Sequence, residues 1–213
     1  MEQQTCARDF ARYTVLSVLG TLGVSCYILA DTFFVSKGLG TNGLTALNLA
    51  IPIYNFIHGS GLMLGMGGAT KFSIYKSQGR SRDIDCIYTN TLYLAALLSA
   101  LFFLTGLLFS GQLSLLLGAD GTVFAMTETY LRWLLLFAPA FILNDVFLCY
   151  VRNDGSPQLA MVAMLIGSFA NIVLDYVFIF PFRMGIFGAI FATGLSPIIS
   201  IAVMSPHWLR KRH

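Results

Sequence analysis

Residues 158–180 read QLAMVAMLIGSFANIVLDYVFIF, and this stretch decides the class of the fold. It has 23 residues, and Asp175 is its only charged side chain. About 20 mostly apolar residues are enough for a helix to cross the hydrocarbon core of a bilayer. The turn before it ends in Ser156, which can cap a helix, and Pro157, which suits the first helical position. The sequence therefore predicts a membrane-spanning helix here.

Composition extends this interpretation to the whole chain. The 213 residues are 56% hydrophobic and 11% charged, whereas a soluble domain is about 45–50% apolar and about 25% charged. The net charge of +3 comes from scattered residues, which excludes the basic stripe of a nucleic-acid-binding protein. The prediction is an all-α polytopic membrane protein with six transmembrane helices, the other five being Tyr13–Ser36, Leu44–Thr70, Ile87–Phe109, Tyr130–Val151 and Ile186–His207.

The basic residues predict the orientation of these helices. If the N-terminus is cytoplasmic, ten of the 13 Lys and Arg residues fall on the cytoplasmic side, and only Lys37, Arg132 and Arg183 fall outside. Cytoplasmic loops carry the excess of Lys and Arg. We expect a multi-pass protein of the cell membrane with both termini in the cytoplasm. Short loops, 37–43 and 77–83 among them, connect the helices.

Three polar residues lie at similar depth in the outer half of the predicted membrane region. Asp31 is six residues before Lys37 and Asp175 is six residues before Pro181, so each lies ~9 Å below the outer end of its helix. Thr193 lies ~12 Å along the sixth helix, and Asn171 is one turn below Asp175 on the same face. Their oxygen atoms could bind a proton or a hard cation such as sodium. Separate local pairing of each group is the alternative, and the residues alone leave both open.

The remaining polar groups of the spans favour structural roles. Asp145, beside Asn144, lies in the inner half of the fourth span, and we expect it to be paired, with Arg152 as a candidate partner. His58 and His207 have no second ligand at metal-binding spacing, and the four cysteines have no metal-ligand spacing either. No catalytic or phosphate-binding motif is present, so we predict no enzyme, no cofactor and no metal beyond a coupling sodium ion.

Prolines and glycines interrupt several spans. Pro52, Pro139 and Pro197 lie inside the second, fourth and sixth spans, where each favours a kink. Gly61 and Gly65 have the GxxxG spacing that lets helices approach closely in lipid. Close packing and helix bending during transport both explain these residues.

In this order the residues resemble the multidrug and toxic compound extrusion (MATE) family. The resemblance rests on ADTFFV at 30–35, GLG at 38–40, GMGGA at 65–69, RNDGSPQLAM at 152–161 and NIVLDY at 171–176. In the prokaryotic branch that includes DinF-like proteins, a cation site implies matching roles here for Asp31, Asn171, Asp175 and Thr193. A family member has twelve helices in two lobes, so the resemblance assigns residues 1–207 to an N-terminal lobe and 208–213 to the start of a cytoplasmic inter-lobe linker.

The resemblance implies export of organic, often cationic, compounds in exchange for sodium or protons. Small-molecule substrates, the lipid bilayer and a second lobe, either a homodimer partner or a separate chain, are the expected partners. The alternative is a truncated six-helix lobe that folds and transports nothing. A membrane-embedded protease is disfavoured because neither Asp31 nor Asp175 stands in a GxGD motif.

Overall fold

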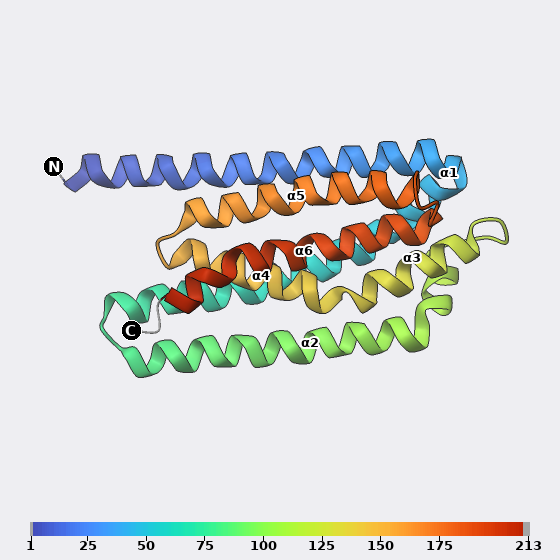
Figure 1. Ribbon diagram of the computed structural model, residues 1–213. Coiled ribbons are helices and arrows are strands. Elements are labelled where there is room, and N and C mark those ends of the chain that lie inside the picture. The colour runs from blue at the N-terminus through green and yellow to red at the C-terminus, as the bar shows by residue number, and fades with distance from the viewer. Residues whose placement is uncertain (1, 211–213) are drawn as a thin grey trace.

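A computed structural model describes the backbone of residues 2–210 and the side chains of residues 10–207. The described chain is entirely helical and forms one elongated bundle (Figure 1). Its helices are α1 (Glu2–Ser77), α2 (Ser81–Leu116), α3 (Phe124–Leu136), α4 (Ala138–Asn153), α5 (Pro157–Ile179) and α6 (Gly185–Arg210). The predicted all-α class is confirmed. Residues 211–213, part of the expected linker 208–213, lie outside the described residues.

Helix α1 accounts for two of the predicted spans. Its 76 residues would measure about 114 Å if straight, several times the ~30 Å hydrocarbon core. The chain instead reverses at Gly40, whose φ of 69° and ψ of −159° are not helical. We call residues 2–39 the first arm and residues 41–77 the second arm, and the two run in opposite directions (Figure 1). The turn is therefore much tighter than the loop expected over residues 37–43.

The fourth span is broken. Helices α3 and α4 meet at Phe137 with a bend of 47° and together form one pass through the bundle. Pro139 occupies the first turn of α4, directly after the bend. With α2, α5, α6 and the two arms of α1, the bundle has the six passes predicted. Four helices are individually long and apolar enough to cross a membrane, and the bent pair is a fifth candidate.

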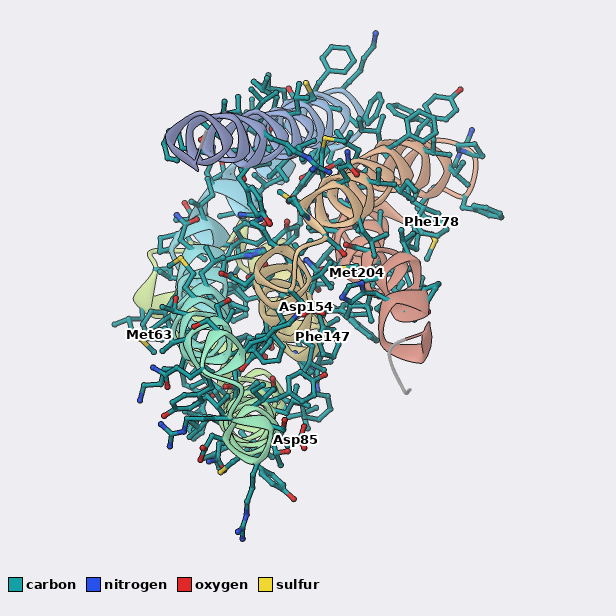
Figure 2. The ribbon with its side chains drawn as sticks, turned by 90° about the vertical axis from the view of Figure 1, so that its left-hand side faces the viewer. Met63, Asp85, Phe147, Asp154, Phe178 and Met204 are labelled. Atoms are coloured by element: carbon teal, nitrogen blue, oxygen red, sulfur yellow. The ribbon has the colours of Figure 1, made fainter. Side chains whose placement is uncertain are left out.

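All passes begin and end at one of two bundle ends. The start of α1, the turn between α1 and α2, the turn between α4 and α5 and the end of α6 lie together at one end (Figure 1). In the view from that end, Asp154 projects near the middle of the bundle and Met63 projects at its edge (Figure 2). The Asp154 carboxylate accepts hydrogen bonds from Lys76 and, at 2.9 Å, from His207. One buried acid thus ties the ends of α1 and α6 to the turn after α4.

Small residues allow the second arm of α1 to pack closely on α4. A Cβ atom on Gly61 would lie 3.2 Å from the Ile142 Cα, and one on Gly65 would lie 3.1 Å from the Val146 Cα. No larger residue fits at this helix separation without movement. Close packing therefore explains the GxxxG spacing, and this contact holds Asp145 against the second arm.

Large apolar side chains cover much of the outer surface of the bundle. Met63, Leu97 and Leu116 are 64%, 70% and 82% exposed. Lipid tails are as apolar as leucine, so a bilayer solvates such a surface where water does not. The surface fits the predicted membrane protein.

Candidate functional site: two adjoining cavities

The four residues of the predicted cation site are all buried in the bundle. Asp31 comes from the first arm of α1, Asn171 and Asp175 from α5, and Thr193 from α6. Asp175 and Asn171 are completely buried, while Asp31 retains 7% and Thr193 4% exposure. The i,i+4 spacing on α5 puts Asn171 and Asp175 on the face that packs against these neighbours. We refer to these four residues as the acidic cluster.

Asn171 connects the members of the acidic cluster. Its side chain lies 3.5 Å from the Thr193 Oγ1. With the amide oriented to match its neighbours, the NH₂ group donates to Asp175 Oδ2 at 2.9 Å and the amide oxygen accepts from the Thr193 backbone N–H at 3.3 Å. Asp31 and Asp175 are close enough for their charges to interact. The two helices α5 and α6 are therefore joined through polar groups at the level of the two acids.

Two carboxylate oxygens of the acidic cluster have no hydrogen-bond partner among the described residues. Asp31 Oδ1 and Asp175 Oδ1 are buried and have no hydrogen-bond partner among the described residues. Among residues 10–207, no basic side chain forms an ion pair with either acid. An unpaired buried carboxylate is costly unless it takes up a proton or a cation. This donor set of carboxylate, amide and hydroxyl oxygens fits either ligand.

A small cavity opens beside Asp31. It has a volume of about 170 Å³, and Asp31, Tyr130 and Thr193 contribute to its wall. Tyr130, on α3, is a member of this site that the sequence analysis missed. It lies close enough to Asp31 and Asp175 to interact electrostatically with both carboxylates. In sequence it is one of several tyrosines at a helix end, so nothing in the chain distinguished it.

A second, larger cavity of about 350 Å³ lies among both arms of α1, α4, α5 and α6. Asp145 lines it, and its Oδ2 lies 2.8 Å from His58 Nδ1. Asp145 is paired, as expected, but the proposed partner Arg152 is wrong: its guanidinium contacts the Met164 Sδ at 3.7 Å. Arg152 stands two helical turns beyond Asp145, whereas Gly61 lets the second arm bring His58 directly to the carboxylate.

Tyrosines separate the two cavities. The hydroxyl groups of Tyr27 on the first arm and Tyr54 on the second arm lie 2.6 Å apart and share a hydrogen bond. Both residues, together with Thr193, line the larger and the smaller cavity. The partition between the cavities is therefore made of single side chains.

The three prolines proposed to permit bending occupy different places. Pro197 lines the larger cavity within α6, and Pro139 follows the bend between α3 and α4. Pro52 lies within the second arm. Its neighbours Ala50, Ile51 and Tyr54 line the smaller cavity. Movement of the helices at these prolines stays a prediction.

Residues 17–177, three quarters of the chain, match the sequence profile of the MatE family. The chain belongs to the MatE family. This finding confirms the resemblance drawn from the sequence, and the family consists of membrane transporters and not of enzymes.

Curated MatE relatives include the multidrug export protein MepA of two Staphylococcus species. The chain is 26% identical to that of Staphylococcus saprophyticus over 210 residues, which cover 99% of this chain and 47% of the relative. It is 27% identical to that of Staphylococcus aureus strain MRSA252 over 200 residues, covering 92% of this chain and 44% of the relative. The chain thus spans about half the length of the curated relatives it matches.

Solved MatE structures share the fold. A MOP superfamily transporter from Pyrococcus furiosus superposes with a TM-score of 0.87 at 29% identity, covering 95% of this chain and 45% of the other. A multidrug resistance MATE family transporter in an outward-facing conformation gives the same values. An inward-facing conformation gives a TM-score of 0.82 at 31% identity, over 88% of this chain and 42% of the other. The bundle corresponds to about half of a MATE structure, which is one six-helix lobe.

Proposed function

We propose that this chain is the N-terminal lobe of a multidrug exporter that moves organic compounds out of the cell in exchange for sodium ions or protons. The observation that carries the proposal is the pair of open, buried oxygens on Asp31 and Asp175. Two buried acids that have no basic partner among the described residues are costly inside a membrane bundle, and use as an ion site accounts for their presence there. The family membership supports the same activity.

The acidic cluster is the proposed site of coupling. Asp31 belongs to the first arm of α1, while Asn171, Asp175 and Thr193 belong to α5 and α6. Binding of a cation or proton among them reduces the repulsion between the two carboxylates and favours the closely packed arrangement of these helices. An ion can shift a conformational equilibrium only by its difference in affinity for the two states. Asp31 Oδ1 and Asp175 Oδ1 supply that difference in affinity if they bind the ion in only one of the two states.

Transport also requires a second lobe. Exporters of this type work by movement of one repeat against the other around a central site. In this proposal the second lobe is a continuation of the chain, a homodimer partner or a separate chain, and the bundle end that holds the start of α1 and the end of α6 faces the cytoplasm. Light scattering of the purified chain distinguishes a dimer from a monomer.

The experiment is efflux of ethidium from cells that produce the chain, compared with the Asp31→Asn/Asp175→Asn double variant. We expect efflux from the original chain and loss of efflux from the double variant at equal membrane abundance. The matched control is Asp83→Asn, because Asp83 is an exposed acid paired with Arg80 near the bundle end. Full efflux by the double variant would refute the coupling role. A strictly monomeric chain without any efflux would support a non-transporting lobe instead.

Vesicles then identify the coupling ion. Vesicles that contain the reconstituted chain are loaded with ethidium, and either a sodium gradient or a proton gradient is imposed alone. Sodium coupling predicts transport with the sodium gradient and none after Thr193→Val, which removes a hydroxyl ligand. Proton coupling predicts transport with the proton gradient and little effect of that variant.

A further inference from the structure

Gly194 on α6 lies directly against the bend between α3 and α4. The Phe137 ring occupies the place where a side chain would stand, because a Cβ atom on Gly194 would lie 2.3 Å from the Cδ2 and 2.4 Å from the Cγ of that ring. Phe137 is the residue at which α3 ends and α4 begins. Gly194 directly follows Thr193, a member of the acidic cluster. We propose that Gly194 and Phe137 are positioning residues, which hold α6 at the height and rotation that the acidic cluster needs.

Other aromatic rings hold Phe137 in place. Trp133 precedes Phe137 by one helical turn, and Phe187 and Phe191 are likewise one turn apart on α6. The ring centroid of Phe191 lies 5.9 Å from that of Phe137, and the centroids of Trp133 and Phe187 lie 4.9 Å apart. Aromatic pairs favour centroid distances of about 4.5–7 Å. The two pairs of rings therefore join α3 to α6, and the same face of α6 continues to Gly194.

The lack of a side chain at Gly194 is explained by this packing. Gly194 lies within α6 and does not have a positive φ, so the backbone itself does not require glycine there. An alanine at this position would force either the Phe137 ring or α6 to move. Protein interiors are close-packed, and an added methyl group shifts side chains and backbone. Since the ring is held by its aromatic neighbours, we expect α6 to take part of the movement.

Thr193 passes a movement of α6 on to the acidic cluster. The Asn171 side chain lies 3.5 Å from the Thr193 Oγ1, and with the amide oriented as above its oxygen accepts from the Thr193 backbone N–H at 3.3 Å. The Asn171 NH₂ group then donates to Asp175 Oδ2 at 2.9 Å. Successive residues of a helix are about 100° apart, so Phe137 and Asn171 contact α6 from different directions. A shift of α6 away from Phe137 therefore alters the hydrogen bonds that orient Asp175.

The bend places this contact at the level where the two cavities meet. Tyr130, two turns before Phe137, lines the smaller cavity, and Phe141, one turn after it, lines the larger cavity. The pass bends by 47° between them, and Thr193 lines both cavities. The inference rests on the proposed function, because the position of α6 affects coupling only if the acidic cluster binds the coupling ion.

Cross-linking measures the position of α6 against α5 without transport. In the full chain with its four native cysteines replaced by alanine, Asn171→Cys and Thr193→Cys are joined by a short bifunctional methanethiosulfonate reagent. We expect Gly194→Ala to slow this reaction at least ~5-fold, because the added methyl group displaces α6. Gly106→Ala is the matched control, since a Cβ atom there would lie 2.6 Å from the Leu135 Cβ in a contact between α2 and α3. It should change the rate by less than ~2-fold, because that contact does not involve α6.

A smaller residue at position 137 should reverse the effect. Phe137→Leu in the Gly194→Ala background makes room for the methyl group, and we expect it to restore cross-linking to within ~2-fold of the original rate. If Gly194→Ala does not fold, which circular dichroism melts show, Phe137→Ala replaces it, because this variant removes the ring without crowding α6. We expect Phe137→Ala to slow cross-linking ~3-fold. An unchanged rate in a folded Gly194→Ala or Phe137→Ala variant overturns the inference.

Ethidium transport by reconstituted vesicles measures the consequence for coupling. Gly194→Ala, in the chain with its native cysteines, should raise the concentration of the coupling ion at half-maximal rate ~10-fold, because binding groups must be held within about 0.5 Å. The maximal rate should change by less than ~2-fold at equal amounts of folded protein. Gly106→Ala should leave the half-maximal concentration unchanged. A purely structural role for Gly194 would lower the amount of folded protein and leave this concentration as it is, which would also overturn the inference.

The two measurements separate this inference from the proposed function. If cross-linking responds as described but the original chain transports no ethidium, the proposed exporter is wrong while the positioning of α6 stands. If transport is lost in the Asp31→Asn/Asp175→Asn variant but Gly194→Ala needs no more coupling ion than the original chain, this inference is wrong while the exporter stands.

Discussion

Gly61 lies directly against Asp145: a Cβ atom on Gly61 would stand 2.9 Å from the Asp145 Oδ2. The same oxygen is bonded to His58, three residues earlier on the same arm of α1. The absence of a side chain at position 61 therefore makes room for the carboxylate and lets the His58 ring reach it. One glycine supports both the packing of α1 on α4 and the polar pair of the larger cavity.

Gly61→Ala should destabilise the protein by about 1–3 kcal/mol, because the added methyl group overpacks a rigid contact. Gly59 is the matched control, since a Cβ atom there would meet nothing within 4 Å. Gly59→Ala should be neutral or stabilising by up to about 1 kcal/mol, because alanine favours the helix. Thermal unfolding in detergent measures both. Equal melting temperatures for the two variants would contradict the packing described here.

Gly40→Ala tests the reversal of α1. The φ of 69° and ψ of −159° at Gly40 belong to a region that is essentially restricted to glycine. We expect a loss of about 1–3 kcal/mol in stability, although a Cβ atom at Gly40 has open space around it. Gly67→Ala is the control, because Gly67 also has open space but lies in regular helix. If Gly40→Ala and Gly67→Ala have the same stability, the backbone conformation at position 40 does not require glycine, and the prediction is wrong.

Asp154→Asn tests the polar tie at the bundle end. Asp154 is buried and bonded to both Lys76 and His207. Loss of its charge should lower stability by about 1–3 kcal/mol, because its two basic partners lose a charged acceptor. Asp83→Asn removes an exposed acid whose pair with Arg80 spans one helical turn, and it should change stability by less than about 0.5 kcal/mol. Chemical denaturation in detergent compares the two, and equal effects would refute a structural role for Asp154.

The turn at Asp120 should respond to acid. The Thr122 hydroxyl donates to Asp120 Oδ1 at 2.8 Å and the Thr122 backbone N–H donates at 3.2 Å. These bonds hold the pKa of Asp120 below its usual range. The ordered turn is thus fully favoured above about pH 4, and this contribution is lost as the pH falls through the lower pKa of the folded state. The Thr122 amide resonance should report the change, and Asp120→Asn should abolish its pH dependence.

The sequence predicted the six passes well because spanning a bilayer demands long apolar segments. It placed the fifth pass within one residue at each end, since Ser156, Pro157 and Pro181 mark the boundaries. It predicted a loop at 37–43 because Gly38, Gly40 and Gly43 favour turns, but Gly40 alone makes the reversal. Nothing in the sequence distinguishes Gly40, which adopts the unusual backbone conformation, from its neighbours Gly38 and Gly43.

The candidate site was partly predictable for a related reason. Depth along a helix follows from residue number, which brought Asp31, Asn171, Asp175 and Thr193 to one level. The direction in which a side chain points around its helix axis, and the distance between neighbouring helices, do not follow from residue number. The partner of Asp145 was therefore assigned to Arg152 on the same helix, whereas His58 reaches it from another helix across the contact that Gly61 permits.

The two cavities share a few lining side chains, and Thr193 is one of them. Its position is set by α6, where its hydroxyl donates to the Ala189 carbonyl at 3.0 Å. A rotation of α6 therefore cannot reshape one compartment without reshaping its neighbour. Any free energy by which an occupant of the larger compartment alters ion affinity in the smaller one must act with equal size in the opposite direction. Communication between the compartments thus needs no extended route through the protein, only the turning of one helix.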